Sequence, residues 1–361
     1  MKIATIFGTR PEIIKLSILI PLLDIEFDQI LIHTGQHYSY KMDKIFFEEL
    51  SLRDCDYTLN IGSGTHAQQT GKMLMQLEKV ILDEKPDLVL VQGDTNSTLA
   101  GALAASKLQI PVAHVESGCR SFDRRMPEEI NRILVDHISD YLFAPDKNAY
   151  NNLTSLECIQ SEKVYLVGNT SVDACLRAKE MFNQESLIEY SLEKRKYILF
   201  TLHRQENTTI DELKEIMKAL NTISEKIKVV FPSHLRTRKV LADQKIEIAD
   251  NVIVTDPLGY KDFMGILMNS KLVMTDSGGI QEEAALLDVP CLILRDNTEW
   301  MVYVEKGKNL ILGTQYKKII HVVNGLLDNE EKLDKIRQIK VPINQGASES
   351  IVSILKKSEL Y

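Results

Sequence analysis

Residues 272–284 read LVMTDSGGIQEEA, an apolar run followed by a serine, two glycines and a helix-forming stretch. The run Leu272–Thr275 has the length and composition of a buried parallel strand. The helix-forming residues that begin at Ile280 mark a strand-to-helix turn, the repeating element of βαβ units. Two glycines and a serine at such a turn let backbone N–H groups approach an anion closely, with the helix dipole behind them. The stretch therefore predicts a parallel α/β fold and a diphosphate site at Ser277, Gly278 and Gly279, with Glu283 one turn further on as an acceptor for ribose hydroxyls.

The same alternation of short apolar runs and longer amphipathic stretches extends through the whole chain. In the first half we expect strands near 2–8, 29–35, 88–94, 111–116, 141–144 and 163–167. In the second half we expect them near 197–203, 227–233, 251–255, 272–275, 290–294 and 309–312. The clearest helices are at 66–84 and 97–107. This pattern is typical of two parallel sheets with helices between the strands.

A chain of 361 residues exceeds the roughly 100–200 residues of a usual single core. We therefore expect two doubly wound domains, residues 1–168 and 169–361, with a hinge near 168–170. The last helix, about 347–358, could pack back on the first domain. Sheets of this kind bind ligands at the carboxyl ends of their strands, so the two domains should face a central cleft.

The composition narrows the class of function. The formal net charge of −8 argues against nucleic-acid or anionic-membrane binding, which need a basic surface. The N-terminus lacks a signal-peptide layout, and no apolar run approaches the roughly 18 residues of a membrane helix. The five cysteines are scattered without a CxxC pair. A reduced, cytoplasmic protein is the expectation.

The end of the first strand offers a second candidate anion site. Thr9 is a candidate N-cap, Pro11 is favoured at the first helical position, and Glu12 would complete a capping box. Arg10 and Lys15 then lie beside a helix N-terminus that attracts anions. Phosphate or sugar contact and a merely well-capped helix are both open interpretations.

Three carboxylates stand at expected strand ends or loops of the first domain: Asp94, Glu116 and Glu128. Because neighbouring parallel strands end at the same edge, Asp94 and Glu116 should lie together. Acids that share a cleft can serve as base and acid. Each alone is more commonly a cap or a salt-bridge partner, but the three together favour proton transfer.

The second half places His203 and Arg204 after one strand and His234 after the next. These residues are candidates for binding phosphate or sugar hydroxyls, and a histidine there can act as an acid. No histidine or cysteine spacing predicts a metal, and no GxSxG elbow predicts a serine nucleophile. Residues 62–67 fit the loose dinucleotide pattern GxGxxA but do not follow the first strand of either domain, so no nicotinamide cofactor is expected.

Six blocks of the sequence together resemble the non-hydrolysing UDP-N-acetylglucosamine 2-epimerases: GTRPEIIK at 8–15, GDTNS at 93–97, HVESG at 114–118, MPEEINR at 126–132, LHRQEN at 202–207 and TDSGGIQEEA at 275–284. The resemblance implies two Rossmann-like domains of the GT-B-like class, a homodimer and no cofactor. It also implies removal of the C2 proton, anti elimination of UDP to a 2-acetamidoglucal, and re-addition of UDP after reprotonation of C2 on the other face.

Carried over by position, the resemblance implies four catalytic residues and a set of nucleotide-sugar contacts. The catalytic residues are Asp94, Glu116, Glu128 and His203, with the assignment of carboxylates to faces left open. The contacts are Arg10, Lys15, Phe263, Ser277, Gly278, Gly279 and Glu283. The residues that would mark activation by the substrate itself are missing from 36–39 and 64–66, so no such activation is expected.

One departure bears on the sugar. Trp300 stands where many members have a ligand-binding arginine, which removes a planar charged donor. The related epimerases of UDP-2,3-diacetamido-2,3-dideoxyglucuronate resemble this chain there and at 120–132. We therefore expect a UDP-N-acetylglucosamine 2-epimerase for surface polysaccharide, with the diacetamidouronate epimerase as the alternative. A GT-B glycosyltransferase, a hydrolysing relative and a non-catalytic sugar-nucleotide binder are more distant alternatives.

Overall fold

The computed structural model describes residues 1–36, 40–181, 185–202, 207, 209–233, 235–298, 300–341 and 344–358. The chain forms two compact units. Unit 1 comprises Met1–Leu176 together with Asn344–Tyr361, and unit 2 comprises Arg177–Ile343. The sequence placed the division at 168–170 and left the last helix open, whereas the structure divides the chain inside a helix and returns its last segment to unit 1.

Unit 1 is built on a seven-stranded parallel sheet with the order β3-β2-β1-β4-β5-β6-β7. Its strands are β1 (Lys2–Phe7), β2 (Asp28–His33), β3 (Tyr57–Thr58), β4 (Leu88–Gln92), β5 (Val112–Val115), β6 (Tyr141–Ala144) and β7 (Val164–Leu166). The six strands expected in this half are confirmed. The two-residue β3 was missed because it is too short to give an apolar run.

The helices of unit 1 connect these strands. They are α1 (Arg10–Leu16), α2 (Leu19–Glu26), α3 (Tyr40–Glu49), α4 (His66–Glu84), α5 (Asn96–Lys107), α6 (Pro127–Ile138), α7 (Lys147–Asn151), the short helical turns η1 (Asn152–Leu156) and η2 (Ser161–Lys163), and α17 (Ala347–Lys357), while α8 (Thr170–Met181) crosses the division. Both helices expected most clearly, α4 and α5, are confirmed. Each begins with a threonine capping box, at Thr65 and at Thr95.

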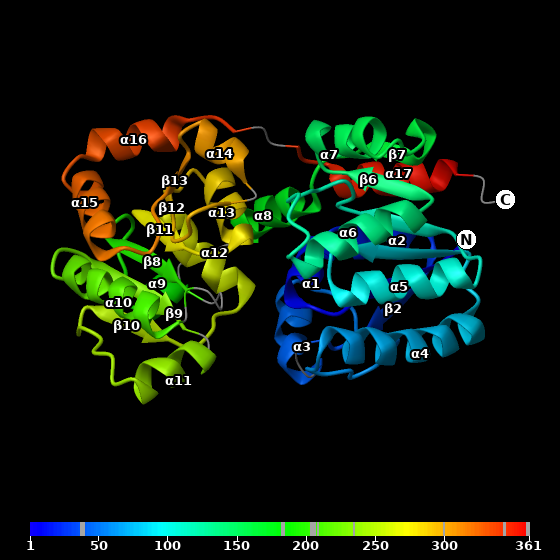
Figure 1. The fold of residues 1–361 in the computed structure, drawn as a ribbon, viewed down its shortest axis with the longest axis horizontal. Coiled ribbons are helices and arrows are strands. Elements are labelled where there is room, and N and C mark those ends of the chain that lie inside the picture. Colours follow the sequence, from blue (N-terminus) through cyan, green and yellow to red (C-terminus); the bar gives the residue numbers. More distant parts are fainter. Residues whose placement is uncertain are drawn as a thin grey trace. The chain divides into compact units, whose positions relative to one another are not determined.

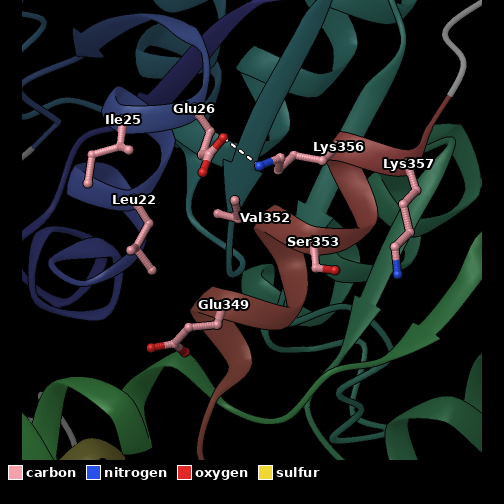
Figure 2. A pocket seen from close by; sticks show the side chains of 8 residues that line it. All are labelled: Leu22, Ile25, Glu26, Glu349, Val352, Ser353, Lys356 and Lys357. Atoms are coloured by element: carbon pink, nitrogen blue, oxygen red, sulfur yellow. Dashed lines mark ion pairs between the residues drawn. The ribbon is translucent and has the colours of Figure 1, made fainter.

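The C-terminal helix α17, red in Figure 1, packs on α2 near the beginning of the chain. Figure 2 shows a groove between these two helices, with Leu22 and Ile25 on one side and Val352 on the other. The groove is closed at one point by an ion pair of 2.6 Å between Lys356 and Glu26. Asp173 in α8 accepts bonds from the backbone N–H groups of Gly346 and Ser348, so the returning segment is tied to unit 1 where α17 begins.

Unit 2 repeats the architecture with a six-stranded parallel sheet of order β10-β9-β8-β11-β12-β13. Its strands are β8 (Tyr197–Thr201), β9 (Lys228–Pro232), β10 (Val252–Thr255), β11 (Leu272–Thr275), β12 (Cys291–Ile293) and β13 (Asn309–Ile311), all of which were expected. Its helices are α9 (Glu185–Glu189), α10 (Ile210–Ser224), α11 (Leu235–Asp243), α12 (Tyr260–Asn269), α13 (Gly278–Leu286), α14 (Met301–Glu305), α15 (Tyr316–Leu327) and α16 (Glu330–Gln338).

In both units the first strand lies beside the fourth, so the strand order reverses there. This order, 3-2-1-4-5-6, is that of Rossmann folds, and ligands bind at the carboxyl ends of the strands where it reverses. The relevant places are the ends of β1 and β4 in unit 1 and of β8 and β11 in unit 2. Each unit has its own apolar core, centred on strand residues such as Val91 and Phe200. No described helix is long and apolar enough to cross a membrane.

Candidate active site

Three acids of unit 1 lie after β4, after β5 and at the start of α6. Asp94 lies in the turn after β4, Glu116 directly after β5, and Glu128 in the first turn of α6. Because Gln92 of β4 pairs with Val115 of β5, both strands end at the same level. The structure therefore brings Asp94 and Glu116 to the same edge of the sheet, with Asp94 at the reversal of strand order and Glu116 one strand away.

Asp94 is anchored by an arginine that the sequence reasoning did not single out. Arg132 in α6 donates to Asp94 Oδ2 from Nη2 at 2.5 Å and from Nε at 2.9 Å. It also donates from Nη1 to Glu129 at 3.0 Å. Burial alone would lower the pKa of Arg132, but Asp94 and Glu129 raise it. The sequence signal that could have identified Arg132 is its spacing, three residues after Glu129 and four after Glu128, because residues at that spacing share a helix face.

Glu116 is held in an uncommon conformation. Its φ of +70° lies in the left-handed region, which costs a non-glycine residue on the order of 1 kcal/mol. Lys15 donates to its Oε2 at 2.6 Å, and Gln92 donates to the same oxygen at 2.5 Å. The side chain of Glu116 is 15% exposed. The two donors fix a partly buried carboxylate at the sheet edge.

Glu128 differs from the other two acids. It is exposed, and among the described residues it has no hydrogen-bond or ion-pair partner. Its neighbour Glu129 is buried and accepts from the backbone N–H groups of Ser121 and Phe122. Burial raises the pKa of Glu129, but these bonds and the one from Arg132 outweigh it and lower the pKa. Glu129 therefore fixes the 121–122 segment, and Glu128 is left exposed at the start of the helix.

The loop after β1 is arranged differently from the predicted capping box. Helix α1 begins at Arg10, so Pro11 is its second residue, and Thr9 makes no cap bond with its side chain. Instead the Glu12 carboxylate accepts from Gly8 N at 3.0 Å, from Thr9 Oγ1 at 2.8 Å and from Thr95 Oγ1 at 2.9 Å. The prediction of a capping box is wrong because the Glu12 side chain turns inward, where its bond from Thr95 joins this loop to the one after β4.

Two predicted cationic contacts of unit 1 already have partners in the structure. Lys15 pairs with Glu116, as described above. The Arg10 guanidinium lies over the Phe46 ring, with its carbon 5.1 Å from the ring centroid. Both side chains are half-buried. Their place near the end of β1 agrees with the position where this fold class binds ligands.

In unit 2 the Ser277–Gly279 turn forms the start of α13 at the carboxyl end of β11. Ser277 N donates to Thr275 Oγ1 at 3.0 Å, and the bond from Gln281 N to Ser277 O, 3.3 Å long, closes the first turn. The first turn carries no acidic residue, and Gly279 is exposed. A Cβ built on Gly279 would meet no heavy atom within 4 Å. This helix N-terminus can therefore receive an anion.

The turn rests on a buried polar base. Thr201 and Thr275, at the ends of β8 and β11, share a hydrogen bond of 2.6 Å. Asn207 Nδ2 donates to the fully buried Asp276 at 3.2 Å and to Leu294 O at 2.8 Å. These bonds fix the turn at the point where the strand order of unit 2 reverses.

Of the other residues expected in unit 2, Glu283 lies half-buried in α13 and Phe263 half-buried in α12. His203, Arg204 and His234 lie outside the described residues. The Trp300 ring stacks on Tyr303, with centroids 5.8 Å apart and planes at 25°. Its backbone N–H bonds to Thr298 Oγ1, which itself donates to Gln281 in α13. The segment at Trp300 is thus attached to the helix that begins at the glycine turn.

Together, two Rossmann-like sheets, acids at the strand ends of one and an open helix N-terminus in the other describe a protein of the doubly wound α/β class, which binds ligands at the carboxyl ends of its strands. The sequence model of one family, described as UDP-N-acetylglucosamine 2-epimerase, matches residues 23–356. The chain therefore belongs to the UDP-N-acetylglucosamine 2-epimerase family. The predicted family and the α/β fold class of two Rossmann-like, GT-B-like domains are both confirmed.

Individual relatives agree with the family. A UDP-N-acetylglucosamine 2-epimerase of Methanocaldococcus jannaschii is 50% identical, over 98% of this chain and 99% of its own. A crystal structure of the enzyme from that organism in complex with UDP-GlcNAc and UDP matches with a TM-score of 0.89 and 48% identity, covering 99% of this chain and 100% of the other. A UDP-2,3-diacetamido-2,3-dideoxy-D-glucuronate 2-epimerase of Pseudomonas aeruginosa is 46% identical, over 89% of this chain and 90% of its own.

Proposed function

We propose that the chain is a non-hydrolysing UDP-N-acetylglucosamine 2-epimerase that interconverts UDP-GlcNAc and UDP-ManNAc. The observation that carries the proposal is the match, at 48% identity over nearly the whole of both chains, to a family member crystallised with UDP-GlcNAc and UDP. The acids at the sheet edge of unit 1 and the open helix N-terminus of unit 2 supply the two groups that this reaction needs. They are proton-transferring carboxylates and a cradle for a departing diphosphate.

In the proposed reaction a carboxylate of unit 1 takes the proton from C2 of the sugar while the bond from C1 to UDP breaks. The described donors to Glu116 all reach Oε2, and those to Asp94 all reach Oδ2. One oxygen of each carboxylate is thus anchored by a cation, and the other is the candidate for contact with the substrate. Proton transfer by positioned carboxylates contributes about 10²–10⁴-fold to such reactions. Glu128 and His203 complete the proposed catalytic set.

The departing UDP has to stay bound until it adds back to the 2-acetamidoglucal. Backbone N–H groups of Ser277, Gly278 and Gly279 would hold its diphosphate at the N-terminus of α13, where the helix dipole favours negative charge. Such preorganised donors stabilise the charge that develops as the bond breaks. Glu283 and Phe263 are proposed contacts of the nucleotide. Arg10, Lys15, Arg204 and His234 are proposed contacts of the phosphates or the sugar.

The second candidate sugar is UDP-2,3-diacetamido-2,3-dideoxyglucuronate. The relative of that activity is 46% identical to this chain, and Trp300 stands where many members have an arginine. An aromatic ring at this position offers an apolar face where an arginine would offer charged donors.

The test is a side-by-side incubation of each UDP-sugar with the enzyme in D₂O, without an acceptor and with NMR detection. We expect UDP-ManNAc to form from UDP-GlcNAc with deuterium at C2. If the enzyme turns over only the UDP-diacetamidouronate, that sugar nucleotide is its substrate and UDP-GlcNAc is not. Free ManNAc and UDP would indicate a hydrolysing relative. Absence of exchange with both sugars would contradict an epimerase and favour a glycosyltransferase or a binding protein.

The setting of the reaction is proposed on the family resemblance alone. We propose a homodimer in the cytoplasm that supplies a sugar nucleotide for surface polysaccharide. Light scattering coupled to size exclusion tests the dimer directly. Loss of the polysaccharide on gene deletion, with recovery on re-expression, tests the role.

A further inference from the structure

A chain of buried charged side chains connects the segments that carry the acids of unit 1. His114 on β5 contacts Asp136 in α6, with 2.6 Å between Nδ1 and Oδ1. Its other ring nitrogen, Nε2, lies 2.8 Å from the carbonyl oxygen of Gly93. Both side chains are fully buried. The ring therefore links the turn that carries Asp94 to the helix that carries Glu128.

The second carboxylate oxygen of Asp136 serves the segment after β5. It accepts from Arg120 Nη2 at 2.6 Å and from the backbone N–H of Gly118 at 3.0 Å. Arg120 also donates to Cys119 O at 2.8 Å and makes a double contact with Glu157, at 2.6 and 2.8 Å. Glu116 lies two residues before Gly118. We call His114, Asp136, Arg120 and Glu157 the Asp136 network.

The network joins groups of opposite charge. Both nitrogens of the His114 ring face oxygen atoms that can only accept, the carboxylate of Asp136 and the carbonyl of Gly93. Burial alone would raise the pKa of Asp136, but the adjacent His114 and Arg120 lower it below its usual range. The Arg120 guanidinium thus bridges the fully buried carboxylate of Asp136 and the partly buried carboxylate of Glu157.

We infer that the Asp136 network is a positioning device that sets the geometry of Asp94, Glu116 and Glu128, with Asp136 as its centre. One carboxylate group reaches the turn after β4 through His114, reaches the turn after β5 directly through Gly118, and is part of α6. Each of the three segments that carry the acids is thereby fixed relative to the same two oxygens. The inference rests on the proposed function, since it assigns these residues to proton transfer.

A purely structural role for the network explains less of what is observed. A buried ion pair is weak evidence for stability, because well-packed apolar residues of similar volume are commonly as stable or more so. The contacts of Asp136 are also not distributed at random over the fold. One of them ends on the backbone N–H of Gly118 in the turn after β5, and another reaches the carbonyl of Gly93 in the turn after β4 through His114. Burying these charges is unfavourable, but it fixes the positions of the segments that carry the acids. A misplacement of about 1 Å at such groups can lower the rate about 10²-fold.

The decisive variant is Asp136→Asn, which keeps the shape of the side chain but replaces one acceptor oxygen with an NH₂ donor. That NH₂ group must face either His114 or the donors of Gly118 and Arg120. For the full-length enzyme with UDP-GlcNAc we expect kcat to fall by about 10²-fold, with C2 deuterium exchange slowed equally. KM should stay within about threefold, because the loss falls on the transition state rather than on binding. His114→Asn, which releases only the Gly93 carbonyl, should lower kcat by about tenfold. Asp83→Asn, at an exposed position of α4, is the matched control and should leave kcat unchanged.

Circular dichroism and thermal unfolding establish that each variant is native at the assay temperature. A folded Asp136→Asn with normal kcat, or one whose loss lies in KM, overturns the inference while the wild-type activity upholds the proposed function. If Asp136→Asn does not fold, His114→Asn decides on the same criteria. An inactive wild-type enzyme would overturn the proposed function and the inference with it.

Discussion

The two units share one topology but treat the reversal of strand order in opposite ways. In unit 1 the ends of β4 and β5 carry acids that are anchored by Arg132, Lys15 and the Asp136 network. In unit 2 the end of β11 carries glycines, a serine and an exposed helix N-terminus with no acid in its first turn. The same fold thus presents charged side chains in one unit and backbone N–H groups in the other.

This difference follows from what each half of the proposed reaction requires. Proton transfer needs side chains whose positions are fixed, and ion pairs with buried or half-buried partners fix them. Retention of a diphosphate needs donors that point outward at low steric cost, which a glycine turn before a helix provides. The comparison predicts that substitutions in unit 1 will reduce turnover, whereas those in the turn of unit 2 will reduce nucleotide affinity.

The largest effect is expected from the acids of unit 1. Glu116→Gln should lower kcat by on the order of 10²-fold or more, because the amide cannot exchange the proton, and Asp94→Asn and Glu128→Gln should do the same. UDP affinity, measured by calorimetry, should stay near that of the wild type. Glu78→Gln, at an exposed position of α4, is the control for loss of an acid. Near-normal rates in all three variants would contradict the assignment of proton transfer to the acids of unit 1.

The next effect concerns an anchor rather than an acid. Arg132→Gln removes the cation that holds Asp94 and Glu129, and we expect kcat to fall by about 10–100-fold with a smaller change in KM. Arg125→Gln is the matched control, since Arg125 also pairs with an aspartate but is 91% exposed. An equal loss in both variants would indicate a general effect of charge and would remove the distinction between anchored and surface pairs.

The glycine turn of unit 2 should respond in affinity. Gly279→Leu places a side chain where the structure leaves open space, so the fold should tolerate it. We expect the dissociation constant of UDP to rise by about tenfold, equivalent to about 1.4 kcal/mol, with little change in thermal stability. Gly325→Leu, in α15, is the control because a Cβ there also meets no heavy atom within 4 Å. Unchanged UDP affinity in Gly279→Leu would place the diphosphate elsewhere.

The smallest effect is a dependence of stability on pH. Burial raises the pKa of Glu12 in the folded chain, against the lowering effect of its bonds from Thr9 and Gly8. The folded state then binds the proton more tightly than the unfolded state. The stability of the wild type relative to Glu12→Gln should therefore decline as pH rises from about 4.3 through the raised pKa. Thermal midpoints of both proteins across this range measure the difference. A wild type that gains stability relative to Glu12→Gln as pH rises would contradict the raised pKa.

Local pattern was enough to predict every described strand except the two-residue β3, and also the turns after β4 and β11. Val89 and Val91 belong to an apolar run followed by a glycine, and Leu272–Thr275 belongs to another, so both strand ends could be located from the sequence. The capping box at Thr9 was predicted wrongly because Glu12 has a tertiary alternative. Its carboxylate bonds to Thr95, 83 residues away, as well as to the adjacent loop.

The partners of the candidate site could not be predicted in the same way. Lys15 and Glu116 are 101 residues apart, and Arg120 and Glu157 are 37 apart. Sequence spacing carries no information about such pairs, because they depend on which strands become neighbours. Arg132 is a partial exception, because its helical spacing from Glu128 and Glu129 could have placed it near those two acids, although the sequence analysis did not single it out.

The sequence by itself determined the α/β class, the approximate positions of the strands except the short β3, and the residues at the strand ends. It did so because apolar runs, caps and glycine turns act over a few residues. Only the tertiary structure decided that Asp136 joins three acid-bearing segments, that Glu12 turns inward, and that α17 returns to unit 1. Those outcomes depend on contacts between distant segments, which form only when the sheet has brought them together.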